Sequence, residues 1–202
     1  MVKGSRYCMP FRRRREGKTD YKKRKALLLS RKPRLVVRGS VRNMVAQIIL
    51  AKVHGDQVIA SAHSRELTRD FGWKASRGNI PSAYLTGLLC GMKAKAKGTN
   101  EAILDIGLQS PVNGTRIFAT TKGVSDAGVN IPYGEVKIPK VEKINGKHIA
   151  SYAESLASSS PEEYKVRFSK YLKEKLKPEE LPKHFSATVK ALEKFQSGGK
   201  KT

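Results

Sequence analysis

The sequence predicts an α/β fold in which antiparallel strands and one crossover strand form a mixed sheet packed with two helices. A basic N-terminal arm precedes this unit, and a C-terminal helical extension follows it. Three observations predict this fold: strand alternation begins at residue 34, an apolar helical pattern leads into a short apolar strand near residue 102, and positive charge is concentrated in the first 42 residues. With 202 residues, 39% of them hydrophobic, the chain can form one domain with an appendage or two small domains.

The arm, residues 1–33, is expected to be extended and to bind nucleic acid. Residues 11–25 contain nine basic and two acidic residues, and residues 1–42 carry +14 of the net charge of +24. Guanidinium groups fit pairs of phosphate oxygens, and Phe11 and Tyr21 offer flat faces to unpaired bases. Such a run is also typical of a solvated, disordered tail. Both interpretations can hold, because arginine-rich segments commonly order when they bind RNA.

The sheet is expected to open with three antiparallel strands. Residues 34–38 alternate, so that Arg34 and Arg38 share a face opposite two buried apolar residues. A longer β-rich run, 41–53, turns at His54-Gly55-Asp56 and returns over 57–64 as a hairpin. Arginines on a rigid sheet can fix the register of a folded RNA, although at strand edges they also protect a sheet against aggregation.

A loop-rich connector, residues 65–80, is expected to use Trp73 as a packing anchor, with a base-stacking platform as the less favoured alternative. The helix that follows, about 82–97, should end at Gly98 and allow another backbone to approach closely at Gly87 and Gly91.

A strand over residues 102–106 is then expected to join the sheet in parallel through this crossover, with Asp105 as a buried acceptor or, less favoured, a site residue. Asn113 should cap a second helix over 114–127, which Gly128 ends.

The predicted domain boundaries follow from this pattern. Residues 34–131 form the α/β RNA-binding domain, and 132–146, rich in Pro and Gly, form an ordered surface loop. Residues 147–196 form the helical extension, with a capping box at Ser160-Pro161-Glu162-Glu163. Its apolar faces are expected to pack on one another and on the α/β domain. Residues 197–202 are expected to be a disordered tail.

Several classes of function find no support in the residues. The four histidines and two cysteines show no metal-ligand spacing, and no phosphate loop, nucleophile elbow or dinucleotide fingerprint is present. We therefore expect no enzyme activity, no catalytic residue, no metal and no cofactor. A membrane partner is not expected, because the basic run lacks an apolar face. Cysteine usage favours the reducing cytoplasm.

The ordered blocks FRRRREGKTDYKKR, PRLVVRGSVRNMVAQII, DFGWK and GLLCGMKAKAKG resemble the universal large-subunit ribosomal protein eighteen. The likeness is to the archaeal form, similar to the eukaryotic large-subunit protein five, and extends from about Tyr7 to Lys194. It implies a protein that binds 5S rRNA at the central protuberance, joins it to the large rRNA and touches neighbouring large-subunit proteins. A ribosomal location in the cytoplasm follows. Bacterial members end soon after the second helix, so they say nothing about the 70 or so residues after Gly128.

The resemblance also implies RNA-binding residues in two of these blocks. In the arm and the first strands these are Arg12, Arg13, Arg14, Arg15, Lys18, Tyr21, Lys22, Lys23, Arg24, Arg34, Arg38, Ser40, Arg42 and Asn43.

Two alternatives remain at this point. A chromatin-like DNA packager would bind duplex DNA and 5S rRNA with equal affinity. An RNA-modifying enzyme would turn over a nucleotide substrate.

Overall fold

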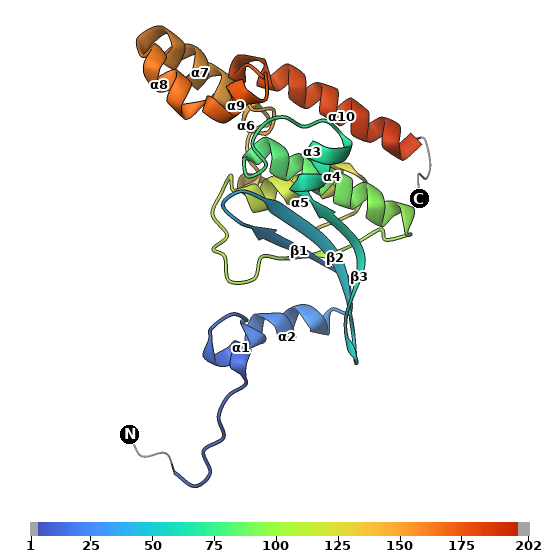
Figure 1. Ribbon diagram of the computed structural model, residues 1–202. Helices are drawn as coiled ribbons and strands as arrows, with labels where there is room; N and C mark the ends of the chain where they lie inside the picture. The colour runs from blue at the N-terminus through green and yellow to red at the C-terminus, as the bar shows by residue number, and fades with distance from the viewer. Residues whose placement is uncertain (1–3, 198–202) are drawn as a thin grey trace.

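The computed structural model describes residues 4–197 and confirms the predicted α/β class. Four strands form one mixed sheet in the order β3-β2-β1-β4 (Figure 1). Neighbouring pairs are antiparallel except β1 and β4, which are parallel as the crossover predicts. The strands are β1 (Arg34–Gly39), β2 (Met44–Lys52), β3 (Gly55–His63) and β4 (Ile103–Asp105).

Two helices, α4 (Ile80–Ala96) and α5 (Arg116–Asp126), cover one face of the sheet (Figure 1). Leu35 and Val37 of β1 are fully buried beneath them, as the alternation in this strand predicts. The expected helix over 82–97 is thus confirmed, with its start at Ile80. The predicted cap of α5 is wrong: Thr115, not Asn113, occupies the cap position, because Gly114 has a φ of +69° that a right-handed helix cannot accommodate.

Glycines set the close spacing of α4 and α5. A Cβ built on Gly87 would lie 2.1 Å from the carbonyl oxygen of Thr120, and one on Gly123 would lie 2.2 Å from that of Tyr84. Gly91 likewise faces the backbone of Val124. The predicted close approach at Gly87 and Gly91 is therefore confirmed. Gly123 of α5 allows the same close approach from the other helix.

The connector after β3 is less loop-rich than predicted, because it begins with a helix, α3 (Ser64–Asp70). A reciprocal cap starts this helix: Arg65 N–H donates to His63 Nδ1, and His63 N–H donates to Glu66 Oε1. Trp73 is completely buried, which confirms it as a packing anchor.

The arm is not extended throughout, so that prediction is wrong for two segments. It contains α1 (Arg12–Arg15) and α2 (Tyr21–Leu29), which lie on the side of the sheet away from α4 and α5 (Figure 1). Ala, Leu, Lys and Arg are all strong helix formers, and Asp20 caps α2, so local preference outweighs charge repulsion here.

Residues after α5 form short helices around the end of the helical layer. The stretch expected as a surface loop contains a turn of 3-10 helix, η1 (Glu135–Lys137), and α6 (Val141–Ile144), whose Ile144 is buried. Beyond it lie α7 (Lys147–Ser159), α8 (Pro161–Arg167), α9 (Ser169–Lys173), η2 (Pro178–Glu180) and α10 (Leu181–Ser197). The tail expected from residue 197 lies outside the described residues from 198 onward.

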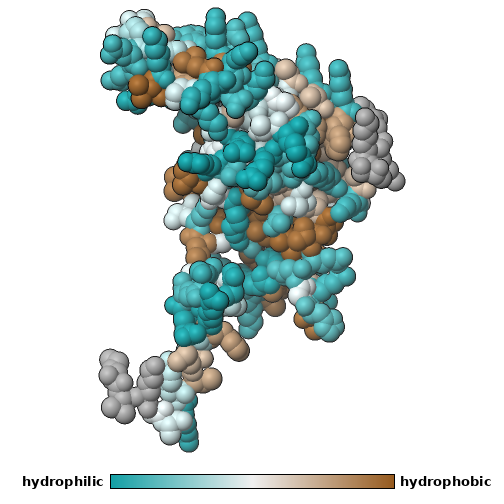
Figure 2. Space-filling view, in the orientation of Figure 1, coloured by the Kyte–Doolittle hydropathy of each residue, from teal (hydrophilic) through white to brown (hydrophobic). Residues whose placement is uncertain are grey.

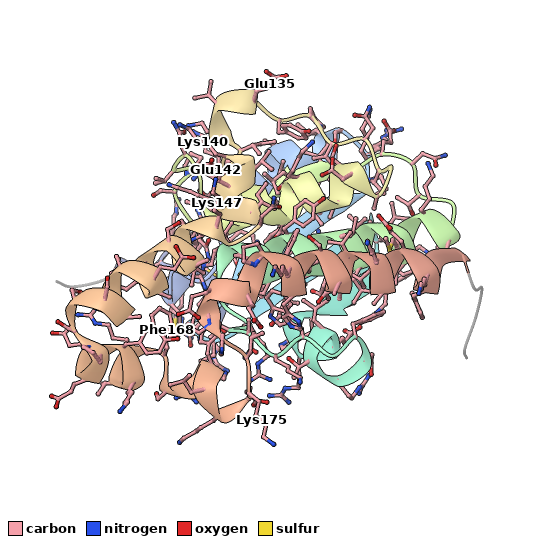
Figure 3. All side chains as sticks on the ribbon, turned by 90° about the horizontal axis from the view of Figure 1, so that it is seen from above. Glu135, Lys140, Glu142, Lys147, Phe168 and Lys175 are labelled. Carbon is pink, nitrogen blue, oxygen red and sulfur yellow. The ribbon has the colours of Figure 1, made fainter. Side chains whose placement is uncertain are left out.

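The extension packs as predicted, with its helices against one another and against the α/β unit. His184 of α10 stacks on Trp73 with ring centroids 5.0 Å apart, and Phe195 meets Phe71 edge to face at 5.5 Å. Phe168 lies between α8 and α9 (Figure 3). Its ring packs against Tyr164, with ring centroids 5.3 Å apart. The capping box predicted at Ser160 is absent, because Ser160 makes no side-chain cap hydrogen bond.

Among residues 4–197, no helix combines the length and the apolar character needed to span a membrane.

Candidate nucleic-acid interface

The first basic element, α1, is a single helical turn made only of arginine, and all four side chains are exposed. Arg12 Nε donates to Glu16 Oε1 at 2.7 Å, and Lys18 Nζ lies 2.7 Å from Glu16 Oε2. Hydrogen bonds from Lys18 and then Arg12 lower the pKa of Glu16. Glu16 thus offsets part of the repulsion within the run, and the four arginines stay exposed to an anionic partner. In the space-filling view the surface of the arm helices is mainly hydrophilic (Figure 2).

The second element, α2, is a basic helix with no buried residue. Asp20 Oδ1 accepts hydrogen bonds from the backbone N–H groups of Lys22 and Lys23, each at 3.0 Å. The bond from Lys23 lowers the pKa of Asp20, so this cap stays ionised at neutral pH. Tyr21 is 42% exposed beside these lysines. The helix therefore exposes the phenol of Tyr21 and several cationic side chains close together on its surface.

An alternating chain of three arginines and two aspartates joins α2 to the sheet. Arg24 Nη2 donates to both carboxylate oxygens of Asp56, at 2.9 and 3.0 Å. Arg34 bridges the two acids, donating through Nη2 to Asp56 and through Nη1 to Asp105, each at 2.9 Å. Arg38 Nη2 then donates to Asp105 Oδ1 at 3.1 Å. We call these five residues the arginine–aspartate network.

Burial differs sharply along the arginine–aspartate network. The Arg34 side chain is 2% exposed and that of Asp105 is 10% exposed, whereas Arg38 is 46% exposed. Partial burial alone would raise the pKa of Asp56, but the hydrogen bonds and charges of Arg24 and Arg34 outweigh burial and lower it. The buried centre of the network therefore fixes the strands, and its two ends reach solvent.

The turn between β1 and β2 holds the other predicted strand residues. Ser40 Oγ donates to the carbonyl of Asn43 at 3.1 Å and accepts from the N–H of Asn43 at 2.9 Å. Arg116 Nη1 braces this turn by donating to the carbonyl of Ser40 at 2.9 Å. Arg42, between the two turn-forming residues, is exposed. Ser40 and Asn43 thus shape a rigid turn that presents Arg42.

A cavity of about 570 Å³ lies between the arm and the β4 edge of the sheet. Arm residues from Arg13 to Leu27 form one wall, and Arg38 together with residues 104–109 forms the other. The cavity exists because α2 lies against the sheet, and the Arg24–Asp56 ion pair is a direct tie between the two.

The structure brings the predicted site residues together in three groups. The exposed arm group is Arg12, Arg13, Arg14, Arg15, Lys18, Tyr21, Lys22 and Lys23. The turn group is Ser40, Arg42 and Asn43, and the network group is Arg24, Arg34 and Arg38. Arg34 differs from the rest, because its guanidinium is buried and bound to two carboxylates.

Sequence reasoning did not identify Asp56 as a partner of the arm, and it assigned no role to the cavity residues of α2 and the 104–109 segment. Asp56 belongs to the predicted turn His54-Gly55-Asp56, and aspartate is common in turns, so nothing in the sequence pointed to a second role. An ion pair between segments distant in sequence leaves no periodic pattern. The sequence offered only one hint of these ion pairs, the large excess of arginine over acidic residues.

Within the part of the chain that the structure describes, no cluster of three or more His, Cys, Asp or Glu side chains could hold a metal ion. Cys90 is buried, and burial raises the pKa of its thiol to about 12, so it is a packing residue and not a nucleophile.

A basic arm held beside an α/β sheet, with its arginines exposed, defines a protein that binds a polyanion. A family model described as ribosomal large subunit proteins 60S L5 and 50S L18 matches residues 5–101 and 93–134. These residues make up more than half of the chain, and the chain therefore belongs to this family of large-subunit ribosomal proteins. It is accordingly an RNA-binding component of a ribonucleoprotein that serves translation, in a family that is not a class of enzymes. The match ends before η1, so the helices from α6 onward lie outside it.

Proposed function

We propose that this protein binds 5S rRNA and attaches it to the large rRNA at the central protuberance of the large subunit in cytoplasmic ribosomes. The observation that carries the proposal is the basic arm held beside the sheet by the Arg24–Asp56 ion pair. Membership of the large-subunit family supports a ribosomal RNA as the polyanion, and the sequence resemblance described above supports 5S rRNA in particular.

The geometry suggests a division of labour among the proposed contact residues. Exposed cations of α1 and α2 neutralise phosphates, while Tyr21 offers a face to an unpaired base. Arg42 and the exposed end of Arg38 lie on rigid strands and turns, so they fix the orientation of the RNA. Arg34 acts from within, by holding Asp105 and thereby Arg38 in place.

The same division follows the proposed domain boundaries. Residues 1–33 and 34–131 supply the RNA contacts, and 132–146 connects them to the extension. Helices of residues 147–196 carry mixed charge, as in the Arg167–Glu163 pair at 3.4 Å. We propose that they extend the docking surface toward neighbouring large-subunit proteins and have little share in primary 5S recognition.

Filter binding of the full chain to folded 5S rRNA tests the proposal. If six to ten phosphates are neutralised, affinity should fall by about 10³ to 10⁵ between 50 and 200 mM salt. A random duplex DNA at equal concentration should not compete; equal competition would favour the DNA-packaging alternative. A flat salt response would contradict phosphate binding.

A matched pair of arginine variants locates the interface. Arg42→Ala should weaken 5S binding by about 1 to 3 kcal/mol, the range of a charge-assisted hydrogen bond desolvated in a complex. Arg167→Ala, an exposed arginine of α8 with 59% side-chain exposure, should leave affinity nearly unchanged. Equal losses would mean that binding depends on net charge alone.

A further inference from the structure

We propose that the cavity between the arm and the sheet receives one unpaired nucleotide of the bound RNA. Its base would lie on the apolar wall of the cavity and its phosphate at the basic rim. The inference deepens the proposed RNA-binding function and rests on it. It specifies what the RNA offers at this position, an extruded nucleotide, and which side chains receive it.

The size and the apolar wall of the cavity fit a base. Its volume of about 570 Å³ falls in the range of pockets that enclose small ligands, roughly 300 to 1,000 Å³. Leu27 of α2 lines the arm side, and Leu104, Ile106 and Leu108 line the sheet side. Leu108 remains 58% exposed in the free chain, so it has apolar surface left to cover. A bare phosphate or a counterion would gain nothing from these leucines, whereas the face of a base would.

The rim of the cavity is positively charged. Five cationic side chains line it, against the two acids Asp20 and Asp105. Both acids are already engaged: Asp20 caps α2, and Asp105 accepts from Arg34, Arg38 and the N–H of Gly107. Four of the cations also have acidic partners: Lys18 with Glu16, Lys23 with Asp20, Arg24 with Asp56 and Arg38 with Asp105. The cavity lining nevertheless has more cations than acids, and this excess is what a phosphate would meet. The cationic residues are Arg13, Lys18, Lys23, Arg24 and Arg38.

Polar groups for the edge of a base are also present. Gln109 and Thr19 line the cavity on opposite walls. A glutamine amide can donate to and accept from the edge of a base at the same time. An RNA helix with paired bases is disfavoured here, because its Watson–Crick edges are occupied and its stacked bases cannot lay a free face on the apolar wall of the cavity. The chemistry therefore selects a single, unstacked nucleotide.

Two leucines of α2 provide a matched test on the free, full-length protein. Leu27 lines the cavity, whereas Leu29 is 74% exposed and does not. We expect AMP at about 5 mM, which suits a Kd near 1 mM, to shift the methyl resonances of Leu27, Leu104 and Leu108 but not those of Leu29. Inorganic phosphate at the same concentration should not reproduce these shifts. Absence of the shifts with AMP, or equal shifts with phosphate, would overturn the nucleotide pocket.

The second test uses folded 5S rRNA and separates this inference from the proposed function. Leu27→Ala should weaken 5S binding by about three- to tenfold through lost apolar contact, and Leu29→Ala by less than about twofold. Lys23→Ala should likewise weaken binding more than Lys22→Ala, since both remove one charge from α2 but only Lys23 lines the cavity. Equal effects within each pair would overturn the pocket alone. If the wild-type chain fails to bind 5S rRNA, the proposed function falls.

Discussion

Replacing Asp105 with asparagine should destabilise the whole α/β unit, although it changes only one atom of the side chain. Asp105 accepts hydrogen bonds from Arg34 Nη1 at 2.9 Å, Arg38 Nη2 at 3.1 Å and Gly107 N–H at 2.9 Å. An asparagine amide has one acceptor oxygen and two donors, so at least one arginine would face an N–H group. Arg34 could not turn to water instead, because its side chain is 2% exposed.

The magnitude follows from these contacts. A hydrogen bond to a charged group contributes about 1.5 to 3 kcal/mol, and removing one partner of a buried ion pair costs about 3 to 5 kcal/mol. Asp56 remains as a second partner for Arg34, at 2.9 Å, and reduces the loss. We therefore expect Asp105→Asn to lower the free energy of unfolding by about 2 to 4 kcal/mol.

Urea unfolding followed by the fluorescence of Trp73, the only tryptophan, measures this loss. Asp70→Asn is the matched control, because Asp70 pairs with its neighbour Arg69 at the surface, with 40% of its side chain exposed. The control should change the free energy of unfolding by less than about 1 kcal/mol. If Asp105→Asn falls in the same range as the control, Arg34 does not depend on Asp105, and the reasoning from burial is refuted.

Three further predictions concern the contacts that hold the layers together. Gly87→Ala should lower the free energy of unfolding by at least about 2 kcal/mol, because its Cβ would meet the Thr120 carbonyl. Gly134→Ala, whose Cβ would meet no atom within 4 Å, should be nearly neutral, and thermal unfolding of both variants measures the difference. Asp56→Asn should speed amide hydrogen exchange in α2 severalfold, with a smaller loss of global stability than Asp105→Asn. Acidification below pH 3.8, the ordinary pKa of Asp56, should have the same effect, because its lowered pKa stabilises the fold only while Asp56 is ionised. Unchanged exchange in α2 would show that Asp56 does not hold the arm. Burial, and then the charge of Lys74, lower the pKa of His184. The docking of α10 should therefore weaken as the pH falls below 6.5, the ordinary pKa of histidine, because the docked state favours the neutral ring. A change in the fluorescence of Trp73, on which His184 stacks, would report this, and His184→Gln should abolish the change.

The sheet and the first long helix could be predicted because their signals are local. Alternation in β1 and the apolar face of α4 each depend on residues a few positions apart. The glycines at 87 and 91 likewise stand four apart on one helix, so their shared face can be read without knowledge of α5. Helix starts were harder to predict, since they depend on single residues: Gly114 at φ +69° delayed α5, and Ser160 precedes α8 without the side-chain hydrogen bond that its sequence predicts.

The candidate site could be predicted only in part. Charge density alone indicated the arm, but it could not show that Arg34 would be buried. Arg34 meets Asp56 and Asp105 across 22 and 71 residues of sequence, and only the strand order β3-β2-β1-β4 places both acids within its reach. Alternation had placed Arg34 and Arg38 on one face, which is correct. Asp56 and Asp105, which bind Arg34 on that face, could not be predicted, because a single residue forms no periodic pattern.

Ionic contacts between the arm and the sheet have a consequence for RNA binding. No residue of α2 is buried, and its ion pair to the sheet, Arg24–Asp56, is partly exposed. Lys32 pairs with the exposed Glu101, which precedes β4. Salt screens such pairs just as it screens phosphate contacts. Added salt therefore loosens the arm in the free protein while it weakens the complex. The core itself is less sensitive to salt, because the Arg34–Asp105 pair is buried.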